Sequence, residues 1–357
     1  MNGLRLLNPG PVTLTPRVRG ALAGPDLCHR EPEFFDMQDR IRARLLAVYD
    51  NDGATWAPVL ISGSGTSAVE AMIASLPGAS DKLLVIENGV YGERMTRMAE
   101  VHGITHVAWH LAWGQAIDER QLAEMIRVHA PTHVAVVHHE TTTGRLNDIA
   151  AIAAVCENHG TSLLVDAVSS FGAEAIAFKQ AVVAVAATAN KCLHGAPGAA
   201  FVIVRHSALA SATTRALYLD LAAYAAKQAA RGTPFTPGIP AFYALDAALA
   251  EHTEAGGWRA RRAHYRGLAD QVGDGLAARG IAEIVARETA SCVLRSYRLP
   301  PGVSYARLHD HLKQAGFVIY AGQGALADDI FRISTMGAID AGDMAELLTA
   351  FDEIIAP

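Results

Sequence analysis

Short apolar runs alternate with amphipathic stretches along the first two thirds of the chain. Each run ends in small or polar residues and is usually followed by a segment whose apolar positions recur at helical spacing. The clearest cases are "VLISGSGTSAVEAMIASL", "LLVIENGVYGERMTRMAE", "VAVVHHETTTG", "LLVDAVSSFG" and "VVAVAATANKCLHG". Short strands that alternate with helices predict right-handed β-α-β units, and therefore an α/β fold with a mostly parallel central sheet. Residues 33–50 also show helical periodicity and predict an amphipathic helix before the first strand.

The pattern changes towards the C-terminus. "GGWRARRAHYRGLADQVGDGLAARG" predicts a charged helix, "CVLRSYRLP", "FVIYAGQG" and "IFRISTMG" predict strands, and "DAGDMAELLTAFDEIIA" predicts a closing helix. The first residues are rich in proline, which disfavours helix in the residue before it, and predict an extended segment. We therefore expect an N-terminal arm over residues 1–16, a large domain over 17–253 and a smaller C-terminal α+β domain over 254–357.

Composition narrows the class of protein. Apolar residues make up 51% of the chain and charged residues 18%, and the net charge is -6. An acidic chain of this kind lacks the basic surface that nucleic-acid binding needs, and we expect no nucleic-acid partner. No apolar run is long enough for a membrane helix, and the start of the sequence does not resemble a signal peptide. The four cysteines show no C-x-x-C spacing, which fits a cytoplasmic protein without a zinc or redox motif.

Two adjacent histidines, His138 and His139, follow one of the predicted strands. With a neighbouring glutamate they could suggest a metal site. However, consecutive residues of a strand point to opposite faces. We therefore expect one exposed and one packed histidine and predict no metal site.

Several turns that follow predicted strands carry polar residues, at the end of the sheet where α/β proteins bind ligands. Residues 62–70 open a helix whose first N–H groups suit a phosphate, and the hydroxyls of Ser64 and Thr66 could add donors. An ordinary strand-to-helix turn is the alternative for this stretch. Tyr91 follows the next strand and could stack on a flat ring or simply pack, and Thr141 could donate its hydroxyl to a ligand.

Asp166 and Lys191 supply the strongest chemical signal. Asp166 ends an apolar strand, where a carboxylate is costly unless a cation such as a protonated pyridine nitrogen accompanies it. Lys191 lies between an uncharged run and a Gly/Pro-rich turn, where desolvation would lower its pKa and make the amine nucleophilic. Taken alone it is more typical of a surface lysine. Together with a phosphate-binding turn, however, these residues match the three anchors of pyridoxal 5'-phosphate, which forms a Schiff base with a lysine.

These stretches resemble a known family. "NPGPV", "SGSGTSAVEA", "NGVYGERM", "HHETTTG", "VDAVSSFG" and "ANKCLHGAPG" resemble the class V, fold-type I aminotransferases, and the resemblance extends over nearly the whole chain to "FRISTMG". Within that class, "HETTTG", "DAVSSFG" and "ANKCLHGAPGAAFVI" are most similar to the 2-aminoethylphosphonate–pyruvate aminotransferases. Relatives that use glyoxylate typically carry glutamine before the lysine, where this chain has Asn190.

The resemblance implies transamination between an amino donor, 2-aminoethylphosphonate, and a 2-oxo acid acceptor, pyruvate, with ping-pong kinetics. Lys191 would bond to the cofactor and then move a proton, and Asp166 would pair with the ring nitrogen. The cofactor-binding residues that it implies are Ser64, Gly65, Thr66, Tyr91, Thr141, Asp166, Val168, Asn190, Lys191 and Thr236. The substrate-binding residues are Arg332, Arg30, His29 and Gly10. It further implies a homodimer with active sites at the interface, in which Thr236 reaches the phosphate of the neighbouring subunit.

One stretch departs from this pattern. "CHREPEF", residues 28–34, is more similar to the corresponding arm of glyoxylate-using relatives. His29 and Arg30 could therefore enter the active site or lie between subunits. An alanine– or serine–glyoxylate aminotransferase is the main alternative. A pyridoxal phosphate lyase or cysteine desulfurase is disfavoured because Cys292 lies in a predicted strand, and a binding protein without activity is disfavoured because Lys191 and Asp166 are both present.

Overall fold

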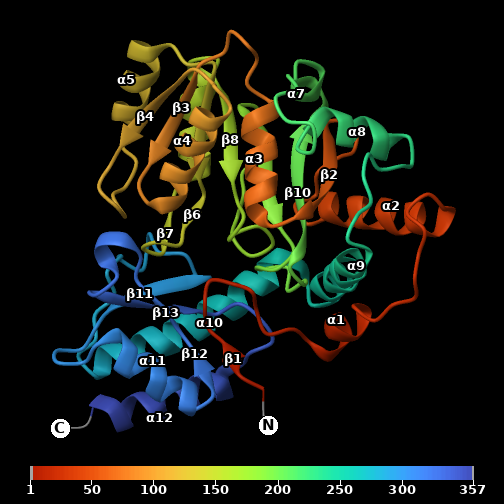
Figure 1. The fold of residues 1–357 in the computed structure, drawn as a ribbon. Coiled ribbons are helices and arrows are strands. Elements are labelled where there is room, and N and C mark those ends of the chain that lie inside the picture. The colour runs from red at the N-terminus through yellow and green to blue at the C-terminus, as the bar shows by residue number, and fades with distance from the viewer. Residues whose placement is uncertain (1–2, 356–357) are drawn as a thin grey trace.

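The computed structural model describes residues 3–355 and contains a large layered part joined to a smaller part built mainly from residues 257–355 (Figure 1). The large part is built on a seven-stranded sheet in the order β2-β10-β9-β8-β5-β3-β4. Its strands are β2 (Trp56–Gly63), β3 (Leu83–Glu87), β4 (His106–His110), β5 (His133–Val137), β8 (Ser162–Asp166), β9 (Val182–Thr188) and β10 (Gly198–Arg205). β10 alone runs opposite to the direction of the other six strands of this sheet, which confirms the predicted mostly parallel arrangement.

Helices cover both faces of this sheet and bury one apolar core on each side. One face carries α3 (Gly65–Ser75), α4 (Val90–Val101), α7 (His206–Ala210) and α8 (Leu221–Ala229). The other carries α2 (Pro32–Ala47), α5 (Glu119–His129), α6 (Ile149–Asn158) and α9 (Ile239–Glu254). Strand side chains alternate between the two cores, as Leu60 and its neighbours Val59 and Ile61 do. Burial on both faces explains why the strands read as nearly continuous apolar runs.

The smaller part packs helices against a three-stranded antiparallel sheet in the order β11-β14-β13. The strands are β11 (Leu294–Arg298), β13 (Tyr320–Ala321) and β14 (Ile330–Ser334), and the helices are α10 (Gly257–Ala278), α11 (Tyr305–Gln314), the 3-10 turn η1 (Gly324–Leu326) and α12 (Ala341–Ile355). A short hairpin of β6 (His139–Glu140) and β7 (Arg145–Leu146) extends from the large sheet towards this part (Figure 1).

The N-terminal segment belongs spatially to the C-terminal part of the chain. Strand β1 (Arg5–Leu6) pairs in parallel with β12 (Phe317–Val318), and Leu7 is buried in the same core as Phe317. Helix α1 (Pro16–Ala21) follows and packs beside α9. The expected boundary between residues 253 and 254 falls at the end of α9, and the division into an arm and two domains remains a prediction.

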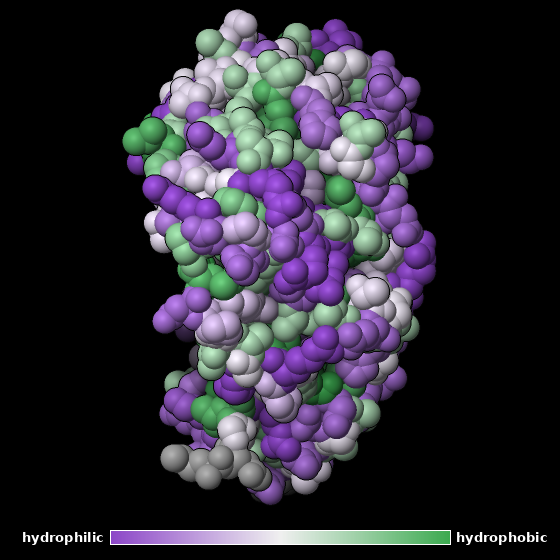
Figure 2. Space-filling view, turned by 90° about the vertical axis from the view of Figure 1, so that its right-hand side faces the viewer, coloured by the Kyte–Doolittle hydropathy of each residue, from purple (hydrophilic) through white to green (hydrophobic). Residues whose placement is uncertain are grey.

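Within residues 3–355, every helix is too short or too polar to cross a bilayer. On the face seen in Figure 2, hydrophobic residues lie in small groups among hydrophilic ones.

Candidate active site

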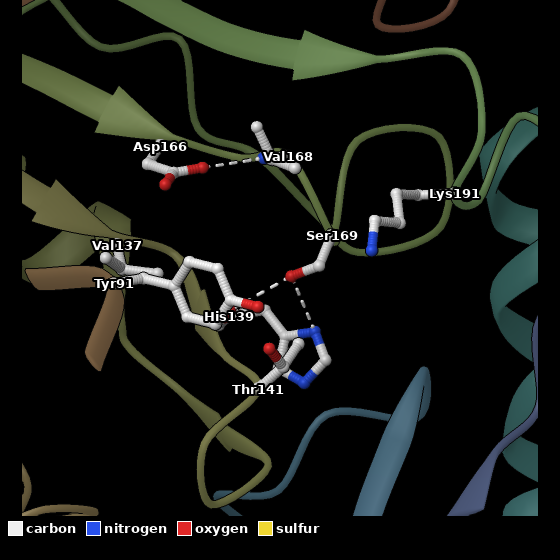
Figure 3. A pocket seen from close by; sticks show the side chains of 8 residues that line it. All are labelled: Tyr91, Val137, His139, Thr141, Asp166, Val168, Ser169 and Lys191. Atoms are coloured by element: carbon white, nitrogen blue, oxygen red, sulfur yellow. Dashed lines mark hydrogen bonds between the residues drawn. The ribbon is translucent and has the colours of Figure 1, made fainter. Parts of the chain in front are cut away.

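The reactive side chains gather at the edge of the large sheet where the parallel strands end. Asp166 is the last residue of β8, Lys191 follows β9, and Tyr91 lies in the first turn of α4. Register pairing of Val137 with Asp166 brings the ends of β5 and β8 together. Figure 3 shows the pocket that results, lined by Tyr91, Val137, His139, Thr141, Asp166, Val168, Ser169 and Lys191. The sequence predicted five of these eight residues.

Lys191 points into this pocket (Figure 3). Burial lowers the pKa of Lys191 to about 8, and the electrostatic influence of Cys192 and Asp166 only partly offsets that effect. Its Nζ donates a hydrogen bond to the carbonyl oxygen of Pro9. Gly10 lies against the lysine, and a Cβ there would stand 2.7 Å from Nζ. A side chain at this place would require Lys191 to move, and the φ of +106° at Gly10 also favours glycine there.

Asp166 is the buried carboxylate of the pocket. Burial raises its pKa to about 6, while the N–H of Val168 and the positive charges of Arg94 and Lys191 act against that rise. The Val168 N–H donates to Asp166 Oδ1 at 2.9 Å. The carboxyl is therefore mostly ionised at neutral pH and can pair with a further cation.

The start of α3 forms the second feature of the site. Ser64 is the N-cap residue, yet its side chain makes no capping hydrogen bond and is exposed. The first N–H groups of a helix have no partner within the helix, and they carry a partial positive charge. Gly65 allows a close approach to the pocket, because a Cβ there would lie 2.6 Å from Val168 Cγ1. This helix end, with the hydroxyls of Ser64 and Thr66, can hold an anion.

Tyr91 is held in place by a carboxylate that sequence reasoning missed. Glu140 is fully buried, and it accepts hydrogen bonds from Tyr91 N at 3.2 Å, Thr142 N at 3.0 Å and Thr142 Oγ1 at 2.6 Å. Burial raises the pKa of Glu140 to about 7 against these hydrogen bonds. The contact with the first turn of α4 fixes the position of the Tyr91 ring relative to β6.

Arg332 reaches the same region from the smaller part of the molecule. It lies in β14, is fully buried, and donates from Nε to the Ala321 carbonyl and from Nη1 to the Thr141 carbonyl, each at 2.8 Å. Its guanidinium carbon lies 5.3 Å from the centre of the Tyr320 ring. Among the described residues, Nη2 of Arg332 has no hydrogen-bond partner. A buried guanidinium with a free N–H group suits an anionic ligand.

Besides the residues described above, four expected residues do not line this pocket. Thr236 is exposed in the segment between α8 and α9, and Arg30 is exposed and His29 half-buried in the segment between α1 and α2. Asn190 adjoins Lys191 and accepts a hydrogen bond from Thr188 Oγ1 at 2.9 Å. The expected contacts of these residues with a ligand therefore stay predictions.

The expectation for the two adjacent histidines was wrong in one respect. His138, just before β6, and His139, its first residue, are both buried. They do face different surroundings, since His139 lines the pocket and His138 lines a separate cavity of about 410 Å³. The imidazole Nδ1 of His139 lies 3.0 Å from Ser169 Oγ, and that hydroxyl also donates to the His139 carbonyl.

The single hydroxyl proton of Ser169 is used in the hydrogen bond to the His139 carbonyl. Nδ1 of His139 therefore carries a proton of its own and donates a hydrogen bond to Ser169 Oγ. The Nε2 atom of His139, which has no partner among the described residues, is then an acceptor. His139, Ser169, Glu140 and Arg94 all lie within the stretches quoted above, and only their proximity in space distinguishes them.

Comparison with known proteins agrees with this geometry. The sequence model of the aminotransferase class-V family matches residues 52–333. The chain is 36% identical to a 2-aminoethylphosphonate–pyruvate transaminase of Aeromonas hydrophila, over 97% of this chain and 93% of that protein. Among solved structures it is similar to an aspartate aminotransferase of subgroup IV from Thermus thermophilus, with a TM-score of 0.90, 29% identity, and 98% and 99% of the two chains covered. An alanine–glyoxylate aminotransferase from Nostoc sp. matches with a TM-score of 0.93, 26% identity, and 99% and 96% coverage. With half-buried Lys191 and buried Asp166 at the ends of neighbouring strands, the chain belongs to the class V aminotransferase family.

Proposed function

We propose that this chain transfers the amino group of 2-aminoethylphosphonate to pyruvate, giving phosphonoacetaldehyde and alanine, with pyridoxal 5'-phosphate as cofactor. The observation that carries the proposal is the largely desolvated Lys191 amine in the same pocket as Asp166, with Arg332 nearby from the smaller part of the molecule. The name of the Aeromonas relative supports the choice of substrates.

The residues present fit the cofactor. Asp166 would pair with the ring nitrogen, the side chains of Tyr91 and Val168 would contact the ring, and the start of α3 would hold the phosphate. Gly65 supports this assignment, because its lack of a side chain keeps the helix end open beside Val168. Thr141 and Asn190 would complete the set. When bound, the cofactor withdraws electrons from the amine-bearing carbon of the substrate, so that a proton can leave that carbon.

The chain itself supplies the proton transfer and the substrate contacts. With a pKa of about 8, Lys191 Nζ is neutral in about a tenth of molecules at pH 7, and this fraction can accept a proton. Asp166 stays ionised and stabilises positive charge next to it. Arg332 would bind the acidic group of either substrate through its free Nη2, since a carboxylate and a phosphonate each present anionic oxygen acceptors to the planar guanidinium fork. Gly10 would border the space in which the substrate binds.

A homodimer is the second part of the proposal. Thr236 is exposed and does not line the pocket of its own chain, which fits a role in the site of a partner subunit. Mixing Lys191→Ala chains with Thr236→Ala chains tests this idea, because a mixed dimer then contains one site with both native residues. Recovery of activity on mixing supports the shared site, and its absence in verified mixed dimers contradicts it.

Steady-state kinetics test the choice of substrate. The ratio kcat/KM is measured for 2-aminoethylphosphonate, alanine and serine as donors, with pyruvate and glyoxylate as acceptors. We expect 2-aminoethylphosphonate with pyruvate to give the highest value. A preference for alanine or serine with glyoxylate would instead support the alternative that residues 28–34 raise, and no turnover of 2-aminoethylphosphonate would exclude the proposed donor. Lys191→Ala is the inactive control.

A further inference from the structure

Arg94 connects the two helices that border the pocket. It lies on α4 one turn after Tyr91, and its guanidinium carbon stands 4.7 Å from the centre of the Tyr91 ring. Its Nη1 lies 3.5 Å from Thr66 Oγ1, in the first turn of α3. Together with Thr66, Tyr91, Asp166 and Val168 it lines a cavity that adjoins the pocket of Lys191. The guanidinium therefore stands where the side chains of α4 meet the N-terminus of α3.

This cation is not neutralised by the chain. Across residues 3–355, Arg94 makes no salt bridge, whereas Arg97 on the next turn of the same helix pairs with Glu100 at 2.8 Å. The neighbouring acid, Glu93, accepts instead from Trp113 Nε1 at 2.7 Å. A half-buried arginine that is not paired with a carboxylate, beside a positive helix end, favours an anion from outside the chain.

The geometry also distinguishes Arg94 from a simple partner of Asp166. The positive charge of Arg94 favours the ionised form of Asp166, but the two side chains form no salt bridge in the described part of the chain. The only side-chain hydrogen bond of Arg94 there is to Thr66 in the first turn of α3, and Lys191 is not among the residues that line the cavity shared by Arg94 and Thr66. The guanidinium thus lies next to the helix start that we propose holds the phosphate.

We propose that Arg94 binds the phosphate of the cofactor together with the start of α3, and so makes the site selective for a phosphorylated ring. This inference rests on the proposed function. The planar fork of arginine can contact two phosphate oxygens while the N–H groups of α3 contact another. The stacking of the guanidinium on Tyr91 would hold that fork in place and connect phosphate binding to the position of the tyrosine ring.

The test compares two ligands that differ only in the phosphate. Dissociation constants of pyridoxal phosphate and of pyridoxal are measured by equilibrium dialysis with the full-length, cofactor-free chain. The variants are Arg94→Met, which keeps an apolar stem over Tyr91, Arg94→Lys, which keeps the charge without the fork, and Arg97→Met as the matched control. Arg97 is suitable because its side chain is exposed on the same helix. Thermal unfolding of each cofactor-free chain checks that the fold is retained.

We expect Arg94→Met to weaken pyridoxal phosphate binding about 10- to 100-fold and pyridoxal binding by less than about threefold. Arg94→Lys should retain part of the selectivity, and Arg97→Met should change neither ligand. Equal losses for both ligands, or no loss for either, would overturn the inference. If Arg94→Met does not fold, Arg94→Lys decides alone, since unchanged selectivity in that variant also contradicts a role for the fork. An unmodified chain that binds neither ligand contradicts the proposed function instead.

Discussion

The buried amine of Lys191 makes a quantitative prediction about stability. Replacing it with methionine removes the charge and keeps a side chain of similar length. In the unmodified, cofactor-free chain, the pKa of Lys191 is lowered from 10.5 to about 8, mainly by burial. The folded chain therefore disfavours the charged amine, and the free energy of unfolding is reduced wherever the unfolded chain is protonated at this position.

The magnitude follows from the two pKa values. A lowering of that size costs about 3 kcal/mol for the charged form, as an upper value because Lys191 keeps some contact with solvent. The group is charged in both states at low pH, so the full cost applies there. As pH rises through about 8 the folded chain loses the proton, and the cost falls to about 2 kcal/mol at pH 9 and disappears above 10.5. Relative to Lys191→Met, the unmodified chain thus gains stability as pH rises.

Urea unfolding followed by circular dichroism measures this difference between pH 7 and 9.5. Only the change with pH tests the reasoning, because loss of the Lys191 hydrogen bond to Pro9 adds an offset that is the same at every pH. Lys179→Met is the matched control, since Lys179 is exposed and should give a flat difference. A flat difference for Lys191→Met as well would refute the claim that burial lowers the pKa of this amine.

Three further substitutions test the construction of the site. Gly65→Ala should lower the free energy of unfolding by about 1–3 kcal/mol, because its Cβ would lie 2.6 Å from Val168 Cγ1. The control is Gly20→Ala, which has open space around it and should be neutral or stabilising in the same urea denaturation assay. Asp166→Asn should reduce kcat for amino transfer at least about tenfold, because the cation at the ring nitrogen loses its charged partner; unchanged kcat would contradict that pairing. Arg332→Lys should lower kcat/KM for the oxo acid about tenfold or more, since an ammonium cannot span the contacts of the guanidinium, and an unchanged value would place the acid-binding group elsewhere.

The fold was largely predictable because its signal is local. Each strand of the large sheet carries enough apolar residues to identify it, and each following helix shows its own periodicity. The antiparallel direction of β10 was not predictable, because an apolar run has the same composition in either direction. The pairing of β1 with β12 was equally hidden, since it joins residues about three hundred positions apart.

The candidate site was likewise predictable only where the sequence carries a local signal. Lys191 and Asp166 could be selected from the sequence because charged residues at the ends of apolar strands are costly without a function. Glu140, His139 and Arg94 could not be selected, because each is a polar residue of an ordinary type until its neighbours are known. Both histidines are buried by other parts of the chain that pack around them. The alternation of side chains along a strand does not predict which parts of the chain pack there.

By itself, the sequence determined the order of strands and helices, the lysine and carboxylate of the site, and the family. Only the tertiary structure decided that Gly10 lies against Lys191, that Arg332 crosses from the smaller part to the Thr141 carbonyl, and that Arg94 stands beside Thr66 without a carboxylate partner. The physical reason is that periodicity records which face of one element is buried. The contacts between elements depend on how the whole chain packs, and they set the pKa values and free hydrogen-bonding groups on which the chemistry relies.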